Sequence, residues 1–183
     1  MSRHEPFTLS PPVGPADHVR GPAHAPVTIV EYGDFECPNC RQAVAVVKVL
    51  LGRSDNRARF AYRHFPLEGV HPHAELAAEA AECAGEQGKF WEMHDLLFEN
   101  QGHLTVPHLR SYAARLQLDM ARFDAELNDH VYLQRVREHV ASGRESGVRS
   151  TPGFFVNDRI QDVSFGHHLL LEAVDAALHR KPR

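Results

Sequence analysis

Two cysteines three positions apart, Cys37 and Cys40, are the residues of this chain best suited to chemistry. They follow the apolar segment Pro26–Val30, which predicts a short buried strand, and they precede the apolar segment Ala43–Leu51. A C-x-x-C pair between a strand and a helix indicates a thiol–disulfide redox site. The spacing alone leaves two alternatives open, namely half of a zinc site and a small structural disulfide.

A helix that begins at this pair would explain its reactivity. If Cys37 caps the helix, Pro38 occupies the first helical position, where its missing N–H costs nothing. Cys40 then lies one turn further along the same face, close enough to form a disulfide with Cys37. The sulfur of Cys37 would lie among unsatisfied backbone N–H groups at the positive end of the helix dipole, which favours the reactive thiolate.

The composition limits the class of protein. With 183 residues, 43% hydrophobic and 24% charged, the chain has room for one globular domain or one domain with an inserted subdomain. The net charge of −4 gives no reason to expect nucleic acid or an anionic membrane as a partner. No apolar run approaches the roughly 18–20 residues needed to cross a bilayer.

The start of the chain lacks the basic-then-apolar pattern of a signal peptide, so we expect a cytoplasmic protein. An exported, periplasmic protein is the alternative if a signal has been removed. The three cysteines do not form a structural disulfide framework. We expect the third, Cys83, to be a buried and inert thiol in an alanine-rich helix.

The other segments predict an α/β fold in which helices interrupt one sheet. We expect residues 1–25 to form an extended or disordered arm, 26–66 and 148–180 a core, and 67–147 an inserted helical subdomain. The helix after the cysteine pair should end at Gly52, and the last helix of the insertion should begin near Asp129. Further strands are expected at Arg57–Phe65, with a wetter face of Arg59, Ala61 and Arg63, at Gly153–Val156 and at Ile160–Val163.

Several motifs in order resemble one known family. The chain is similar to the DsbA-like (disulfide-bond oxidoreductase A-like) branch of the thioredoxin-fold superfamily over about residues 17–178. This resemblance implies a thioredoxin-like fold with an inserted helical subdomain, and thiol–disulfide exchange as the activity. The motifs that carry it are Ala25–Glu31 leading into Cys37-Pro38-Asn39-Cys40, Arg63–Leu67, Gln87–Trp91 and Ser150–Val156.

The resemblance also implies roles for individual residues. Cys37 would be the nucleophile and Cys40 the thiol that resolves the mixed disulfide. Thr151 and Pro152 would form a loop with a cis peptide bond facing the cysteines, and Pro38 and Asn39 would support the site. Strongly oxidising members have a histidine within the motif, where this chain has Asn39, and a less oxidising couple is therefore expected.

Glu31 corresponds to the acidic residue that many members carry six positions before the first cysteine. Because the preceding residues of its strand are apolar, we expect Glu31 to be at least partly buried beneath the pair, with a raised pKa. It could then accept a proton from Cys40 during release of the mixed disulfide. The alternative is a structural glutamate paired with a nearby arginine or lysine.

Two other functional classes stay open at this point. One is a glutathione-dependent transferase or isomerase, for which a single thiol at position 37 would suffice. The other is a redox-sensing or zinc-binding module in which His64, His71 and His73 join the cysteines. For the leading class we expect protein thiols or disulfides as substrates and an unidentified redox partner. We expect no metal and no cofactor beyond the Cys37–Cys40 disulfide, and no oligomeric state is predicted.

Overall fold

The computed structural model describes residues 7–164 and 166–180. Its centre is a five-stranded sheet in the order β1-β3-β2-β4-β5, in which only β2 and β3 pair in parallel. From β2 onward the predicted succession of strand, helix, strand, several helices, two strands and a helix is confirmed. The strands are β1 (His18–Arg20), β2 (Val27–Gly33), β3 (Ala58–His64), β4 (Gly153–Val156) and β5 (Arg159–Gln161).

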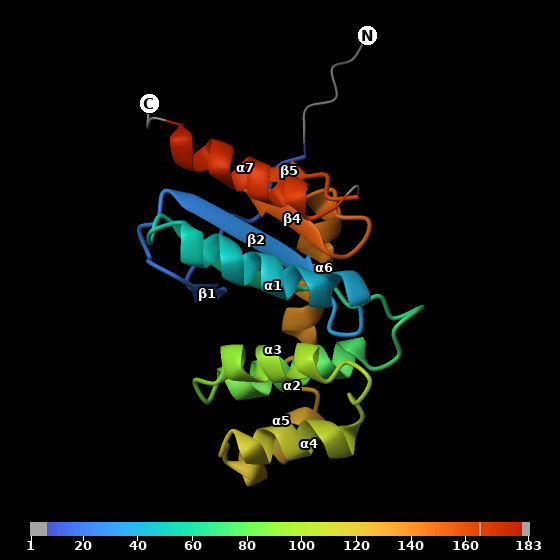
Figure 1. Cartoon of the computed structure of the whole chain (residues 1–183). Helices are drawn as coiled ribbons and strands as arrows, with labels where there is room; N and C mark the ends of the chain where they lie inside the picture. The colour runs from blue at the N-terminus through green and yellow to red at the C-terminus, as the bar shows by residue number, and fades with distance from the viewer. Residues whose placement is uncertain (1–6, 165, 181–183) are drawn as a thin grey trace.

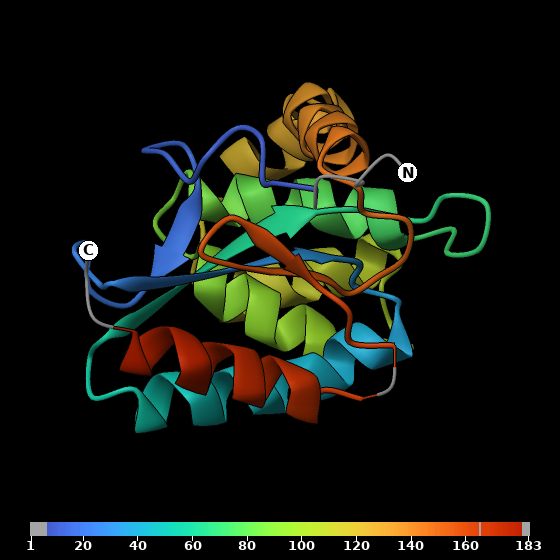
Figure 2. The ribbon, with the colours of Figure 1, turned by 90° about the horizontal axis from the view of Figure 1, so that it is seen from above.

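Helices cover both faces of this sheet. Helices α1 and α7 lie side by side on one face, and α6 crosses the opposite face (Figure 2). Helices α2 to α5 stack beyond the sheet, and together with α6 they form the insertion between β3 and β4 (Figure 1). The helices are α1 (Pro38–Arg53), α2 (Ala74–Gly85), α3 (Phe90–Glu99), α4 (Val106–Arg115), α5 (Met120–Asn128), α6 (Leu133–Glu145) and α7 (His168–His179).

Strand β2 leads the chain into the cysteine pair. It pairs with β3 on one side and β4 on the other, and it is buried along nearly its whole length, as central strands covered on both faces are. It includes Glu31, as expected, and continues beyond the predicted apolar segment to Gly33. A carboxylate is therefore part of the buried central strand.

Helix α1 begins as the sequence predicts, with Cys37 as N-cap and Pro38 at the first helical position. Its valines are indifferent helix formers, but the residues that face the core, Cys40, Ala43, Val47 and Leu50, recur at helical spacing. The predicted end at Gly52 is one residue short. The helix runs to Arg53 and closes where the backbone N–H of Ser54 donates to the Leu51 carbonyl, at 3.4 Å.

The predicted wetter face of β3 is wrong for Ala61 and Arg63, which are buried, whereas Arg59 is half-buried. Arg63 is 2% exposed, because the N-terminal segment crosses this face and Asp17 accepts two hydrogen bonds from the Arg63 guanidinium, at 2.7 and 3.0 Å. The carbonyls of Pro11 and Pro12 accept two more. The same segment adds β1 to the sheet edge, a strand that the sequence analysis did not predict.

Two boundaries in the second half of the chain differ from prediction. Helix α6 begins at Leu133, later than the expected Asp129, because α5 ends at Asn128 and His130 has a positive φ of 52°. The strand expected at Ile160–Val163 is β5, which ends at Gln161. No helix among the described residues is long and apolar enough to cross a membrane.

Candidate active site

The two cysteines lie at the end of β2 and the start of α1, and both are free thiols. Cys37 is 6% exposed, whereas Cys40, one turn further into the helix, is fully buried. The Cys37 sulfur faces the loop before β4, and in its protonated form it donates a hydrogen bond to the Thr151 carbonyl at 3.4 Å. The Thr151–Pro152 peptide bond is cis, as predicted. The chain thus brings Cys37, Cys40, Thr151 and Pro152 together.

The two thiols have opposite electrostatic environments. The pKa of Cys37 falls to about 5, first because the Cys40 thiol donates a hydrogen bond to the Cys37 sulfur, and also because the backbone N–H groups of Asn39 and Cys40 point at it. The pKa of Cys40 is raised, first by burial and then by its hydrogen bond to Cys37. Cys37 is therefore the thiolate of the pair, and Cys40 stays protonated.

This asymmetry predicts which thiol reacts with an alkylating agent. As pH rises through about 5, Cys37 loses its proton, so its rate of alkylation by iodoacetamide should rise with a midpoint near pH 5. Cys40 and Cys83 should stay unmodified at neutral pH, because burial raises the pKa of Cys40 and raises that of Cys83 to about 12. Mass spectrometry of the alkylated protein measures both. A midpoint near the free-thiol value of about 8.5, or first modification at Cys40, would contradict this assignment.

Glu31 is 1% exposed and lies beneath the pair. The Cys40 thiol is within hydrogen-bonding reach of its carboxylate, and its Oε1 atom has no hydrogen-bond partner. Its pKa rises to about 8, first because of burial and then because of the negative charge on Cys37. Within residues 7–164 and 166–180 no arginine or lysine pairs with it, so the ion-pair alternative is wrong for the described structure.

Asp34 supports the loop between β2 and α1, and the sequence analysis missed it. Its carboxylate accepts hydrogen bonds from the backbone of Glu36 at 2.7 Å and of Leu67 at 2.8 Å, and His71 Nδ1 lies 2.8 Å away. Its carbonyl accepts the backbone N–H of Cys37 at 3.1 Å. An aspartate three residues before a helix cap that bonds the backbone two residues on is a local turn signal that could have been recognised.

Gln101 is a second support residue that the sequence analysis missed. Its side-chain amide donates to the carbonyls of Phe35 at 2.8 Å and Cys37 at 2.9 Å. It reaches them from the loop between α3 and α4, so no local sequence pattern indicates it. Pro38 and Asn39, in contrast, are exposed on the outer side of the motif, where a partner protein could contact them.

The histidines considered for a zinc site do not gather around the cysteines. His71 contacts Asp34, and His64 contacts Glu82 at 2.8 Å. Among the described residues, the three ligating side chains close enough to share an ion are His64, Glu82 and His139, without either cysteine. Glu82 is already held by Arg135 at 2.7 Å, and its bonds join β3, α2 and α6 in one polar network. The proposed Cys–His zinc set is wrong for the described residues.

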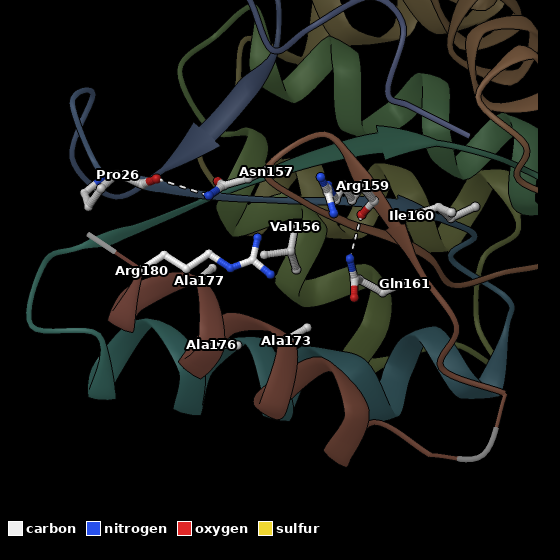
Figure 3. Close-up of a pocket in the computed structure, with 10 residues that line it drawn as sticks. All are labelled: Pro26, Val156, Asn157, Arg159, Ile160, Gln161, Ala173, Ala176, Ala177 and Arg180. Carbon is white, nitrogen blue, oxygen red and sulfur yellow. Dashed lines mark hydrogen bonds between the residues drawn. The ribbon is translucent and has the colours of Figure 1, made fainter. Parts of the chain in front are cut away.

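A groove of about 590 Å³ lies apart from the cysteine pair, between α7 and the strands β4 and β5 (Figure 3). Its amide side chains bond within the chain, Asn157 to the Pro26 carbonyl at 3.3 Å and Gln161 to the Arg159 carbonyl at 2.8 Å. None of the residues that line it is a cysteine, histidine or carboxylate. This groove therefore does not include the cysteine pair.

A protein-family model described as thioredoxin matches residues 14–176. Among curated proteins, the chain is 52% identical to a Na(+)/H(+) antiporter NhaA 1 of Salinispora arenicola over 92% of this chain and 26% of that protein. It is 43% identical to a Na(+)/H(+) antiporter NhaA of Herminiimonas arsenicoxydans over 84% of this chain and 24% of that protein. The chain thus spans about a quarter of the length of these curated relatives.

Solved structures with the same fold cover nearly the whole chain. BdbD from Bacillus subtilis superposes with a TM-score of 0.80 at 22% identity, covering 88% of this chain and 92% of that one. A thioredoxin-like oxidoreductase from Silicibacter pomeroyi gives 0.77 at 28% identity, with 92% and 95% covered. DsbA2 from Pseudomonas aeruginosa gives 0.68 at 26% identity, with 90% and 96% covered. The thioredoxin-like fold with a helical insertion is therefore shown.

Proposed function

Because the chain belongs to the DsbA-like part of the thioredoxin family, we propose that it is a thiol–disulfide oxidoreductase acting on protein thiols or disulfides. The pair Cys37–Cys40 would alternate between dithiol and disulfide, with a mixed disulfide on Cys37 as intermediate. The observation that carries this proposal is the contrast between a low-pKa thiol at the helix start and a buried, protonated thiol one turn away.

The chemistry follows from that contrast. The Cys37 thiolate attacks one sulfur of a substrate disulfide, forms a mixed disulfide and releases the other substrate sulfur as a thiolate. Cys40 then gives its proton to Glu31 and attacks the Cys37 sulfur, so that the Cys37–Cys40 bond forms and the second substrate thiolate leaves. The reverse sequence oxidises a substrate dithiol. The potential of the partner sets the direction.

The two other functional classes fit the site less well. A glutathione-dependent transferase or isomerase needs one reactive group at position 37, whereas here the Cys40 sulfur lies within hydrogen-bonding reach of both Cys37 and the buried Glu31 carboxylate. A zinc-binding module would need ligands around the cysteines, and the described histidines bond elsewhere. Both the second thiol and the buried acid favour dithiol exchange.

The antiporter relatives do not change this proposal. This chain spans about a quarter of each of those proteins. The thioredoxin-family model covers residues 14–176, which is most of this chain. We propose redox exchange for that stretch, and not ion transport. Their partners and transport activity are therefore not assigned to this chain.

The test is catalysis of insulin reduction by dithiothreitol, combined with the reduction potential measured against glutathione. The Cys37 pKa of about 5 lies between the free thiol at about 8.5 and the strongest oxidants at about 3.5. We therefore expect a potential between roughly −120 and −270 mV. Cys83→Ala should keep both properties. No catalysis by the wild-type protein, or a potential outside this range, would contradict the proposal.

A further inference from the structure

The buried position of Glu31 poses a problem of proton exchange. In the reduced protein the thiolate of Cys37 helps to hold a proton on Glu31, since that negative charge raises the Glu31 pKa. The charge is lost when Cys37 enters a mixed disulfide, so Glu31 must then release its proton before it can accept one from Cys40. With 1% exposure, Glu31 has no direct contact with water through which to do so.

Tyr62 is the titratable group that faces Glu31 from the neighbouring strand. The two residues are register partners in the parallel β2–β3 ladder, so their side chains point to the same face of the sheet. The Tyr62 hydroxyl is fully buried and has no hydrogen-bond partner. The Tyr62 hydroxyl lies close to Gly33. A Cβ atom at position 33 would be 2.7 Å from the hydroxyl oxygen, so only glycine fits at this position. The raised pKa of Tyr62 reflects burial first, and then the charges on Cys40 and Glu31.

His94 of α3 continues from Tyr62 towards the surface. The two rings meet edge to face, with centroids 4.8 Å apart and an interplanar angle of 83°. His94 Nδ1 lies 2.9 Å from the carboxylate of Asp95, so this nitrogen carries the proton and Nε2 presents a lone pair. Nε2 is buried and has no partner. Asp95 is 26% exposed in its side chain and contacts Arg20 at 3.1 Å, at the surface.

Unpartnered buried polar atoms are rare in folded proteins, and those that occur call for an explanation. Here three such atoms belong to residues that are neighbours in turn, Glu31 and Tyr62 through strand register and Tyr62 and His94 through ring contact. The last of these residues bonds the partly exposed carboxylate of Asp95. Such atoms are the kind that a buried water molecule joins into a chain. We propose that Tyr62 and His94 carry protons between Glu31 and Asp95, and hence between the cysteine pair and solvent.

Each transfer on this path is balanced. With a buried water bridging each gap, a proton leaves the Glu31 carboxyl towards the Tyr62 hydroxyl as the hydroxyl proton moves towards His94 Nε2, and the Nδ1 proton passes to Asp95 and then to solvent. When Cys40 leaves the disulfide, it takes up the Glu31 proton, and the reverse transfers return a proton from solvent to Glu31. Over a complete cycle of oxidation and reduction the uptake and release are equal, so the imidazole returns to its first tautomer.

The groups that surround the path determine its pH dependence. Glu31 faces Cys37 at the N-cap of α1, Cys40 within α1 and Tyr62 from β3. Tyr62 in turn faces Asp34 and His64. His94 faces Asp95 of its own helix, Arg20 from β1 and His64 from β3, and burial is the first cause of its lowered pKa. His94 is therefore neutral near pH 7, as a group that both accepts and donates protons must be.

The inference rests on the proposed exchange activity and is tested by stopped-flow measurement of its two steps. Tyr62→Phe and His94→Gln keep most of the side-chain shape and remove the transferable proton. Attack by Cys37 on a substrate disulfide should keep its rate within about twofold. Release of the mixed disulfide should slow at least about tenfold in both variants, with an altered pH profile and a larger effect of deuterated water. The matched control is Tyr112→Phe, whose hydroxyl donates to the His103 carbonyl in the insertion.

The outcomes separate the two proposals. If the wild-type protein forms no mixed disulfide, the proposed function is wrong, whatever the variants do. If it does, unchanged release in either variant overturns the path through Tyr62 and His94. Equal slowing of both steps, or slowing without a change in the pH profile, would show a structural role and would also overturn it. Far-UV circular dichroism and urea unfolding confirm that each variant is folded.

Discussion

Replacing Cys37 with serine should reduce disulfide exchange to the uncatalysed rate, whereas replacing Cys40 with serine should trap the protein in a mixed disulfide through Cys37. The first change removes the thiolate whose pKa lies at about 5. The second leaves that nucleophile in place but removes the thiol that would attack the Cys37 sulfur one turn away. Incubation with oxidised insulin, followed by non-reducing electrophoresis and mass spectrometry, measures both.

Cys83→Ala is the control for this experiment, because Cys83 is fully buried in α2 and has a pKa of about 12. It should exchange like the wild type. A mixed disulfide that forms through Cys40 in the Cys37→Ser variant would reverse the assigned roles. Trapping of comparable amounts through either cysteine would show that the environment of the helix start does not distinguish the two thiols.

Local sequence signals were sufficient for the cysteine pair. The cap at Cys37, the proline at the first helical position and the apolar spacing of α1 depend only on residues within a few turns of one another. The burial of Glu31 could be predicted because the apolar residues before it indicate a central strand. The facing loop with Thr151 and Pro152 came from the family resemblance, since it lies far away in sequence.

The rest of the site could not be predicted because it depends on contacts between distant segments. Gln101 reaches the pair from the helical insertion, and Tyr62 faces Glu31 only through the register of β2 with β3. Arg63 was expected on a wetter face of β3, because the alternation of side chains along a strand does not show which other segment covers that face. The arm that buries it carries Asp17, more than forty residues earlier in the chain.

Glu31→Gln should leave the rate of Cys37 attack nearly unchanged and slow release of the mixed disulfide by about a hundredfold, within the range typical of a lost general base. Cys40 needs such a base because burial raises its own pKa. In the wild type, release should accelerate as pH rises and Glu31 loses its proton. The midpoint should fall below the value of about 8 for the reduced protein, since the mixed disulfide lacks the charge on Cys37. The glutamine variant should lack this dependence.

The same substitution has a second, independent effect on stability. A buried carboxyl whose pKa rises from 4.5 to about 8 binds its proton more tightly in the folded state, so its contribution to the free energy of unfolding is lost as pH rises through that window. Glu31→Gln should therefore make reduced protein more resistant to urea at pH 9 than the wild type, and the difference should shrink towards pH 5.

A glutamate held in a structural ion pair would give the opposite result, with a less stable variant at pH 9 and an unchanged release rate. Urea titrations at both pH values and stopped-flow measurement of release from about pH 5 to 9 together decide whether Glu31 is the proton acceptor.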